Sequence, residues 1–221
     1  MTVNGVQKTL NVGDTATLDG KKVRILGFNH DELADSDKTT AYDSATETGK
    51  AGISFEYVDF LTSAGMNSSD TNSGGWSASA LRGTLNGTTY SSMITTYHIK
   101  KVKKDYIPTY NVASTQQTED YLWLLSCGEI WDNGYNGGVT RGSAIATEGK
   151  QYKYYKINLR STSYSDLSNF IRKPNVSNSM GWWLRSPLYN NSDYFCYVYE
   201  IGYCLHDIAS DLLKVAPGFS I

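Results

Sequence analysis

The chain is short of several features that identify common classes of protein. Its 221 residues include three cysteines, four prolines and three histidines, and the formal net charge is −2. Three cysteines cannot form a complete disulfide framework, because one is always left over. Four prolines argue against a proline-rich linker. The small net charge argues against a large basic surface, so we expect no nucleic-acid partner.

Long hydrophobic runs are also missing. No apolar stretch approaches the roughly 18 residues of a transmembrane helix, so we expect no membrane insertion. The first residues have neither a basic n-region nor an apolar h-region, and we expect no secretory signal peptide at this start. No CxxC, HExxH, P-loop, GxGxxG or GxSxG motif occurs, which argues against the zinc, phosphate and esterase sites that these spacings support.

Aromatic residues and glycines are abundant. The chain contains 17 tyrosines, five tryptophans and 20 glycines, and hydrophobic residues make up 40%. This composition is sufficient for a packed core with many turns. Because we find no internal repeat and no composition boundary, we expect one domain over residues 1–221.

The first half of the chain is dominated by strand patterns. Residues 12–28 alternate between polar and apolar around Asp19-Gly20, a pair typical of a tight hairpin turn. Residues 53–57 alternate as well. Residues 29–49 are polar and acidic, and we expect a solvent-exposed loop.

Two charged segments could in principle bind a ligand, but solvent exposure alone explains their charge. Calcium binding by Asp31, Asp35 and Asp37 is disfavoured, because no glutamate stands at the twelfth position after any of them. Residues 97–104 predict a strand whose lysines form a basic face, which we also expect to be solvated.

Helical patterns are short. Residues 76–87 predict a helix capped by Ser77 and ended by Asn86-Gly87, and a second short helix is expected around 89–95. Residues 121–125 are an apolar run of strand length. The following Ser126 and Glu129 match a capping box, so a helical turn is expected there. Gly-rich residues 132–149 are expected to be a loop. Together these elements indicate an α+β fold with antiparallel sheets.

The cysteines admit a structural and a reactive interpretation. Cys196 lies in the apolar alternation of residues 195–198 and is expected to be a buried thiol. Cys204 lies two residues before His206, and a neighbouring histidine is one condition for a reactive thiolate. Nothing else in the sequence supports the second interpretation.

The last forty residues carry a distinctive set of letters. WWLRSP at residues 182–187 is followed by FC-x-V at 195–198, by Ala209-Ser210 and by VAPGF at 215–219. Further segments match at 25–31, 50–55, 74–76 and 122–126. The chain resembles a C-type-lectin-like domain family of gut bacteria and their phages, some members of which are variable proteins of diversity-generating retroelements.

This resemblance implies a C-type-lectin-like fold shared with formylglycine-generating enzymes. It also implies a rigid scaffold whose C-terminal segment displays residues that vary when reverse transcription miscopies template adenines. Adenine changes in an AAC codon can encode Asn, Asp, His, Tyr, Ser, Leu, Ile or Cys, and all of these occur here. Glu200 and Lys214 cannot arise in this way. Ile201, Cys204 and Ser220 stand where the family usually has Asp, Trp and Cys.

The candidate ligand-binding residues occupy the free slots of the family pattern. They are Tyr189, Asn190, Asn191, Asp193, Tyr194, Tyr197, Tyr199, Tyr203, Leu205, His206, Asp207, Asp211 and Leu213. Tyrosine offers a large contact area and a hydroxyl with few rotatable bonds, as in antibody paratopes. Strand alternation directs Val198 inward and places Tyr197 and Tyr199 on one face. The alternative is that these tyrosines simply cover a core.

The fixed letters are expected to be structural. Trp182, Trp183 and Leu184 should anchor the core, and Arg185 should pair with a buried acid or with carbonyl groups. The resemblance further implies that residues 217–219 close a terminal strand that pairs with the N-terminal strand.

We therefore expect a non-catalytic protein of a virion or cell surface that binds a protein or glycan on a cell, without a cofactor or metal. One alternative is a metal oxidase like the formylglycine-generating enzymes, with Cys196 and Cys204 as a copper-binding pair, although fold analogy is a weak basis for chemistry. The other is a structural module of a surface protein without diversification.

Overall fold

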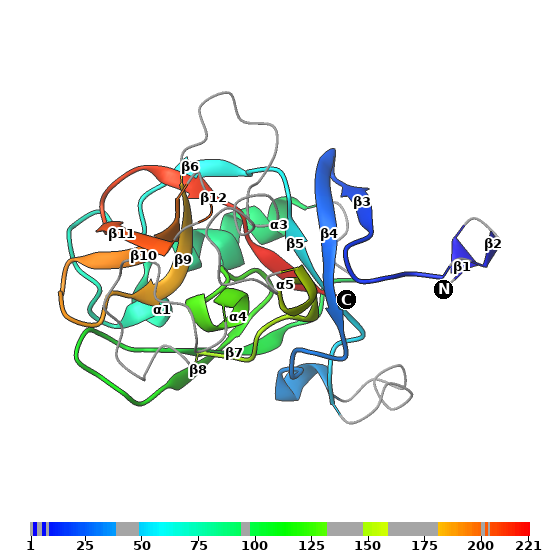
Figure 1. Cartoon of the computed structure of the whole chain (residues 1–221), viewed down its shortest axis with the longest axis horizontal. Coiled ribbons are helices and arrows are strands. Elements are labelled where there is room, and N and C mark those ends of the chain that lie inside the picture. The colour runs from blue at the N-terminus through cyan, green and yellow to red at the C-terminus, as the bar shows by residue number, and fades with distance from the viewer. Residues whose placement is uncertain are drawn as a thin grey trace.

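A computed structural model describes residues 2–3, 6–7, 9–38, 49–93, 98–131, 148–158, 181–199, 202 and 204–221. Over these residues the chain has a mixed α and β fold with mostly antiparallel sheets and short helices (Figure 1). The sequence-based expectation of this class is confirmed. None of the helices in the described part of the chain is long and apolar enough to cross a membrane.

Two larger sheets organise the described residues. The four-stranded sheet has the order β13 (Gly218–Ser220), β5 (Ile53–Tyr57), β4 (Lys21–Phe28) and β3 (Thr15–Leu18), all antiparallel. The five-stranded sheet has the order β11 (Cys204–Ile208), β10 (Tyr194–Val198), β9 (Trp182–Pro187), β12 (Leu213–Val215) and β6 (Thr62–Ala64). In it only the β9–β12 pair is parallel.

Shorter elements complete the described structure. Two hairpins pair β1 (Thr2–Val3) with β2 (Val6–Gln7) and β7 (Val102–Tyr106) with β8 (Gln116–Asp120). The helical elements are η1 (Asp35–Asp37), α1 (Gly75–Ala78), α2 (Ala80–Thr84), the π-type η2 (Leu85–Thr89), α3 (Tyr90–Ser92), α4 (Cys127–Trp131) and α5 (Lys153–Asn158). In Figure 1 the β10–β11 hairpin lies at one end of the long axis, with α4 and α5 between it and the β3–β4 hairpin.

Local turn chemistry explains the β3–β4 hairpin. Asp19 and Gly20 both have positive φ, 48° and 75°. This pair of conformations gives a two-residue loop whose twist matches that of the strands. The predicted hairpin and the predicted strand at 53–57 are both confirmed.

β9 is buried on both of its faces. Trp183 packs in a first apolar cluster with Trp76, Trp123, Phe195 and Phe219. Trp182 and Leu184 pack in a second cluster with Leu26, Tyr155, Cys196 and Val198. Because successive strand residues point to opposite faces, this division follows directly from the sequence WWL. The expected anchoring role of the three residues is confirmed.

The predicted helix at 76–87 is interrupted. Ser79 has an extended backbone and ends α1, and its hydroxyl accepts a hydrogen bond from Arg82 N to cap α2. The predicted cap at Ser77 is therefore wrong. Asn86 does not stop the helix either, because its side chain accepts from Tyr121 N and donates to Leu122 O, a tertiary contact. The chain instead continues through η2 into α3.

Two strand predictions also need correction. Residues 121–125 form no regular strand, and within the described part of the chain their one ladder contact is an isolated bridge from Trp123 to Gly218. The run is apolar because it lies in the core, where Leu122 to Leu125 are fully buried. The terminal strand β13 pairs with β5 and not with the N-terminal strand, since β5 occupies the place between β13 and β4.

The capping box at the start of α4 is confirmed. Ser126 Oγ accepts from Glu129 N at 3.1 Å, and Glu129 Oε2 accepts from Ser126 N at 3.0 Å. The same Glu129 oxygen accepts from Arg185 Nη1 at 2.6 Å. The expected pairing of Arg185 with a buried acid is therefore confirmed. Gly-rich residues 132–147 lie outside the described residues.

Candidate functional site

The two fixed stretches of the C-terminal segment and the candidate ligand-binding residues differ in burial. Every residue of Trp182–Pro187 is buried, and so is every residue from Val215 to Ser220. Asn190 and His206 are exposed. Half-buried candidates are Tyr189, Asn191, Asp193, Tyr194, Tyr197, Tyr199, Leu205, Asp207 and Asp211. Tyr203 lies outside the described residues. The structure thus separates a buried scaffold from a set of side chains that reach solvent.

The β10–β11 register divides the candidates between the two faces of the hairpin. Cys196 lies opposite His206, and Tyr194 lies opposite Ile208, so these four share one face. Tyr197 lies opposite Leu205 on the other face. Among the described residues β11 is one of the two edge strands of its sheet. Both groups therefore border the same edge, which we call the β11 edge and define as Tyr194, Tyr197, Tyr199, Leu205, His206 and Asp207.

Aromatic pairs lie on each side of the β11 edge. The rings of Tyr194 and His206 meet edge to face with centroids 5.2 Å apart. Tyr197 and Tyr199 meet in the same way at 6.4 Å, as expected for residues on one face of a strand. The inward orientation predicted for Val198 is confirmed by its full burial. Each face thus offers an ordered aromatic pair.

Two candidates contribute to the core. Leu213 is 8% exposed and belongs to the first apolar cluster, so its side chain is not available at the surface. The reason is topological: β12 lies inside the sheet between β9 and β6, and Leu213 faces Ala64. Tyr197 also packs partly against this cluster, with its ring 6.2 Å from that of Trp183.

The turn that carries Tyr189 to Asp193 is held by Asn72, which sequence reasoning missed. Asn72 is fully buried, and its amide donates to Asn191 O at 2.7 Å and to Tyr194 O at 3.0 Å. Its backbone N–H donates to Ser192 O at 2.6 Å. Nothing in the surrounding polar sequence distinguishes this asparagine from its neighbours, because its partners are about 120 residues away.

Burial shifts the pKa values of three groups on the β11 edge. Burial lowers the pKa of His206, so its ring is neutral at pH 7. Burial and a hydrogen bond with Asp211 raise the pKa of Asp207. Burial, with the nearby Asp207 carboxylate, raises the pKa of Tyr197 to about 12. The tyrosine hydroxyl therefore stays protonated and can both donate and accept.

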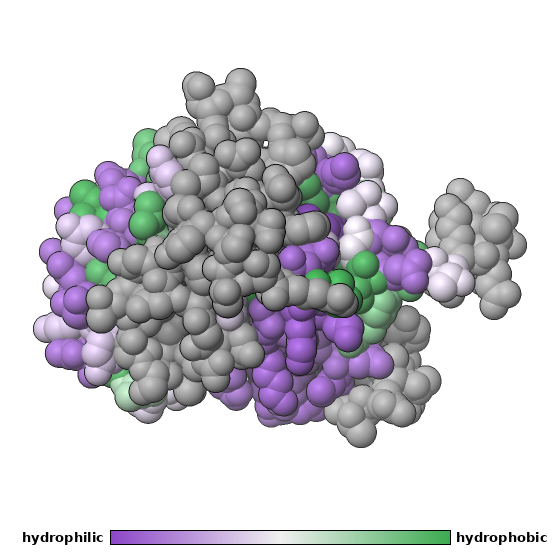
Figure 2. Space-filling model, in the orientation of Figure 1, coloured by the Kyte–Doolittle hydropathy of each residue, from purple (hydrophilic) through white to green (hydrophobic). Residues whose placement is uncertain are grey.

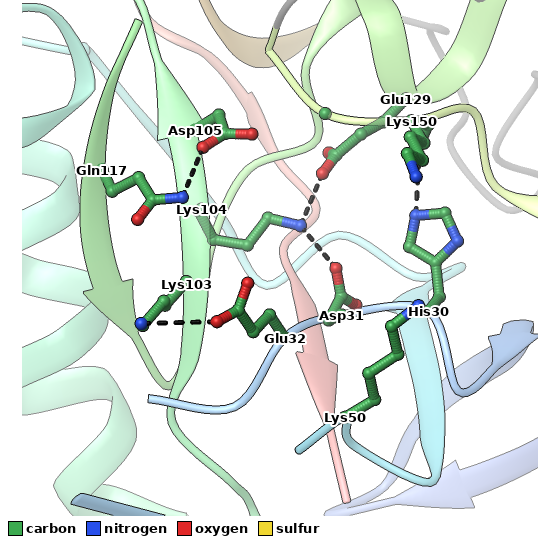
Figure 3. Close-up of a pocket in the computed structure, with 11 residues that line it drawn as sticks. His30, Asp31, Glu32, Lys50, Lys103, Lys104, Asp105, Gln117, Glu129 and Lys150 are labelled. Atoms are coloured by element: carbon green, nitrogen blue, oxygen red, sulfur yellow. Dashed lines mark hydrogen bonds and ion pairs between the residues drawn. The ribbon is translucent and has the colours of Figure 1, made fainter. Parts of the chain in front are cut away.

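A polar cleft of about 400 Å³ lies elsewhere, beside β7 (Figure 3). Hydrophilic side chains gather over this region of the surface in Figure 2. The residues that line the cleft are His30, Asp31, Glu32, Lys50, Lys103, Lys104, Asp105, Gln117, Glu129, Gly149 and Lys150. Among the described residues, the lining carries both signs of charge and includes no serine, threonine or cysteine.

The floor of the cleft is a buried ion network. Lys104 Nζ lies 2.8 Å from Asp31 Oδ1 and 2.5 Å from Glu129 Oε1 (Figure 3). It also donates to the hydroxyl of Tyr152 at 3.1 Å. Burial alone would raise the pKa of Asp31, but the charges of Lys104 and His30 lower it to about 2. All three donors of Lys104 are used, so this lysine has a structural role.

Two expectations of solvation are therefore wrong at one charged residue each. Asp31 and Lys104 are 4% and 2% exposed, whereas the sequence placed the first in a solvent-exposed loop and the second on a solvated strand face. Each is buried because the other neutralises it across 73 residues of chain. Asp35 pairs with Lys38 and Lys103, which further disfavours a calcium site.

Metal-ligating side chains converge at one place in the described residues. The sulfur atoms of Cys127, Cys196 and Cys204 lie within 4.8 Å of one another, and all three residues are fully buried. The expected burial of Cys196 is confirmed. Contact with the other two thiols, together with burial, raises the pKa of the Cys196 thiol well above its ordinary value. At neutral pH the uncomplexed group is therefore a protonated thiol and not a nucleophile.

Comparison with known proteins identifies one family. Residues 48–221, more than three quarters of the chain, match the family model of a domain of unknown function, DUF6273. The match includes β9 to β13, the loop that contains Asn72, and all three cysteines. No curated protein and no solved structure matches the chain. The chain belongs to the DUF6273 family.

Proposed function

We propose that this protein is a non-catalytic recognition domain that binds a protein or glycan ligand on a cell surface through the β11 edge. We further propose that it has a C-type-lectin-like fold and is the variable protein of a diversity-generating retroelement of a phage or bacterium. In that role it acts at the surface of a virion or cell.

One observation carries the proposal: the two long fixed stretches of the C-terminal segment are buried, whereas nearly all described candidate residues reach solvent. The fixed stretches Trp182–Pro187 and Val215 to Ser220 are buried throughout. Of the twelve described candidates in the free slots, eleven reach solvent and Leu213 does not. A diversified protein needs this arrangement, because varied side chains inside the core would create cavities or overpacking that cost stability.

The physical character of the β11 edge also suits recognition. Tyrosine and histidine rings supply contact area at small entropic cost, and their polar atoms supply hydrogen bonds. A neutral His206 and a protonated Tyr197 avoid the desolvation cost of burying charge in an interface. Asn72 holds the adjoining turn, so less order has to be gained on binding.

Binding can be measured with one variant from each face of the hairpin. The labelled chain is applied to a glycan array and to intact gut bacteria, with His206→Ala and Tyr199→Ala beside it. Phe28→Ala is the matched control, since Phe28 is 41% exposed but lies on β4 of the other sheet. We expect both edge variants to weaken binding by about 5-fold or more, as for interface hot spots, and the control to bind as the wild type does.

Failure of the wild-type chain to bind any glycan or cell would contradict the recognition function. Equal loss in the control would contradict the location at the β11 edge. Diversification has a separate test in the genome: we expect a reverse transcriptase gene nearby and a near-copy of the 3′ end of the gene that differs at adenines. Without both, the chain is a recognition domain that does not diversify.

A further inference from the structure

All three cysteines of the chain meet at one point. Cys196 and Cys204 lie on the same face of the β10–β11 hairpin, where Cys204 is opposite Val198 and Cys196 is opposite His206. Cys127 approaches from the start of α4, where its backbone N–H donates to Ser186 Oγ at 3.0 Å. Three separate segments thus bring together every thiol in a sequence of 221 residues. Packing of small apolar groups does not require such convergence.

The sulfur separations match a three-coordinate metal. Cys127 Sγ and Cys204 Sγ are 3.6 Å apart, and no pair among the three exceeds 4.8 Å. Three sulfurs in a plane around one ion, each at a metal–sulfur distance of about 2.3 Å, would be separated by about 4.0 Å. Small side-chain rotations therefore suffice to place all three around a common centre.

The ligand set and its surroundings select the kind of ion. Thiolates prefer soft metals, chiefly Cu(I) and zinc. Structural zinc takes four ligands, but in the described part of the chain no fourth Cys, His, Asp or Glu joins the cluster. The three cysteines belong to the second apolar cluster, together with Leu125 and Ile130, so the described surroundings of the sulfurs are mainly apolar.

We propose that Cys127, Cys196 and Cys204 form a buried trigonal site for Cu(I). This site lies on the same hairpin as the β11 edge, where Cys196 is opposite His206, but it does not depend on the recognition function. On binding, copper–sulfur bonds form and the thiol protons pass to solvent, while copper remains Cu(I) and no electron is transferred. The ion would tie α4 to the β10–β11 hairpin.

The test uses the full chain, reduced and without oxygen, titrated with Cu(I) against a chromophoric Cu(I) chelator. We expect one copper per chain, a sulfur-to-copper charge-transfer band, and an X-ray absorption spectrum with three sulfur neighbours. Cys127→Ala, Cys196→Ala and Cys204→Ala should each weaken binding at least about 100-fold. Near-ultraviolet circular dichroism reports whether each variant is folded.

The wild-type spectrum tests the site even if a variant does not fold. A copper ion with only two sulfur neighbours would overturn the proposal. So would copper binding that persists in a triple variant in which all three cysteines are replaced by alanine. So would a wild-type affinity no tighter than that of the urea-unfolded chain. Four-coordinate zinc that competes successfully with Cu(I) would overturn the choice of metal.

Discussion

Arg185→Lys is expected to destabilise the fold although it conserves charge. Arg185 is fully buried, and three of its nitrogens serve four acceptors. Nε donates to Asp105 O at 2.9 Å, Nη1 donates to Leu124 O and to Glu129 Oε2, and Nη2 donates to Glu148 O at 2.7 Å. A lysine ammonium is a single donor atom and cannot reach acceptors spread around the guanidinium plane.

The magnitude follows from the acceptors that are left without a donor. The ammonium can retain Glu129, and Glu148 O also accepts from Ser126 Oγ. Asp105 O and Leu124 O would then lose the Arg185 hydrogen bond. Each buried unsatisfied group costs about 1–3 kcal/mol, so for two groups we expect the free energy of unfolding to fall by about 2–6 kcal/mol. This range is comparable to the cost of breaking a buried ion pair.

Urea unfolding followed by tryptophan fluorescence measures this loss, provided that the slope m is unchanged. Arg82→Lys is the matched control. Its side chain is 25% exposed, so water can replace lost donors, and Asp120 keeps its hydrogen bonds from Trp76 Nε1 and Thr118 Oγ1. The control should lose about 1 kcal/mol or less. A loss at Arg185 below about 1 kcal/mol, or one equal to that of the control, would refute the reasoning.

Two further predictions concern proton binding and backbone space. Burial raises the pKa of Glu148 from 4.5 to about 7. The folded state therefore binds this proton more tightly, and we expect the stability contributed by Glu148 to be greatest below pH 4.5 and to fall by about 3 kcal/mol as the pH rises to 7. Unfolding curves of Glu148→Gln should lack this slope, and identical pH profiles would exclude it. Gly83→Ala should stabilise the chain by about 0.5–1 kcal/mol, because Gly83 is an exposed α2 residue with nothing near a new Cβ. Gly75→Ala should destabilise the chain, because Gly75 has a φ of 54° and the added Cβ would lie 2.1 Å from Ile107 O. Thermal unfolding of the two variants checks both predictions, and equal shifts of their melting temperatures would contradict them.

Local signals in the sequence predicted local structure well. The Asp19-Gly20 turn and the capping box of Ser126 and Glu129 both depend on atoms within four residues of one another. The burial of Trp182 and Trp183 on opposite faces follows from strand alternation. These features survive in the fold because no distant contact competes with them.

Predictions failed where a distant partner intervened. The helix expected to end at Asn86 continues, and the Asn86 side chain bonds residues 121 and 122 in addition to Arg82 O of the preceding turn. The family pattern leaves the position of Leu213 free and so predicts it on the ligand surface, but its strand lies inside the sheet. Neither outcome can be inferred from neighbouring residues.

The sequence by itself determined the α+β class, the first hairpin, the buried framework of the C-terminal segment and the pairing of Arg185 with an acid. Only the tertiary structure decided that Asp31 meets Lys104, that Asn72 holds the turn before β10 and that the three cysteines converge. The physical reason is the distance along the chain over which each interaction acts. Turn conformations, caps and strand alternation act over a few residues, whereas a buried charge or thiol cluster exists only when chain topology brings remote segments together.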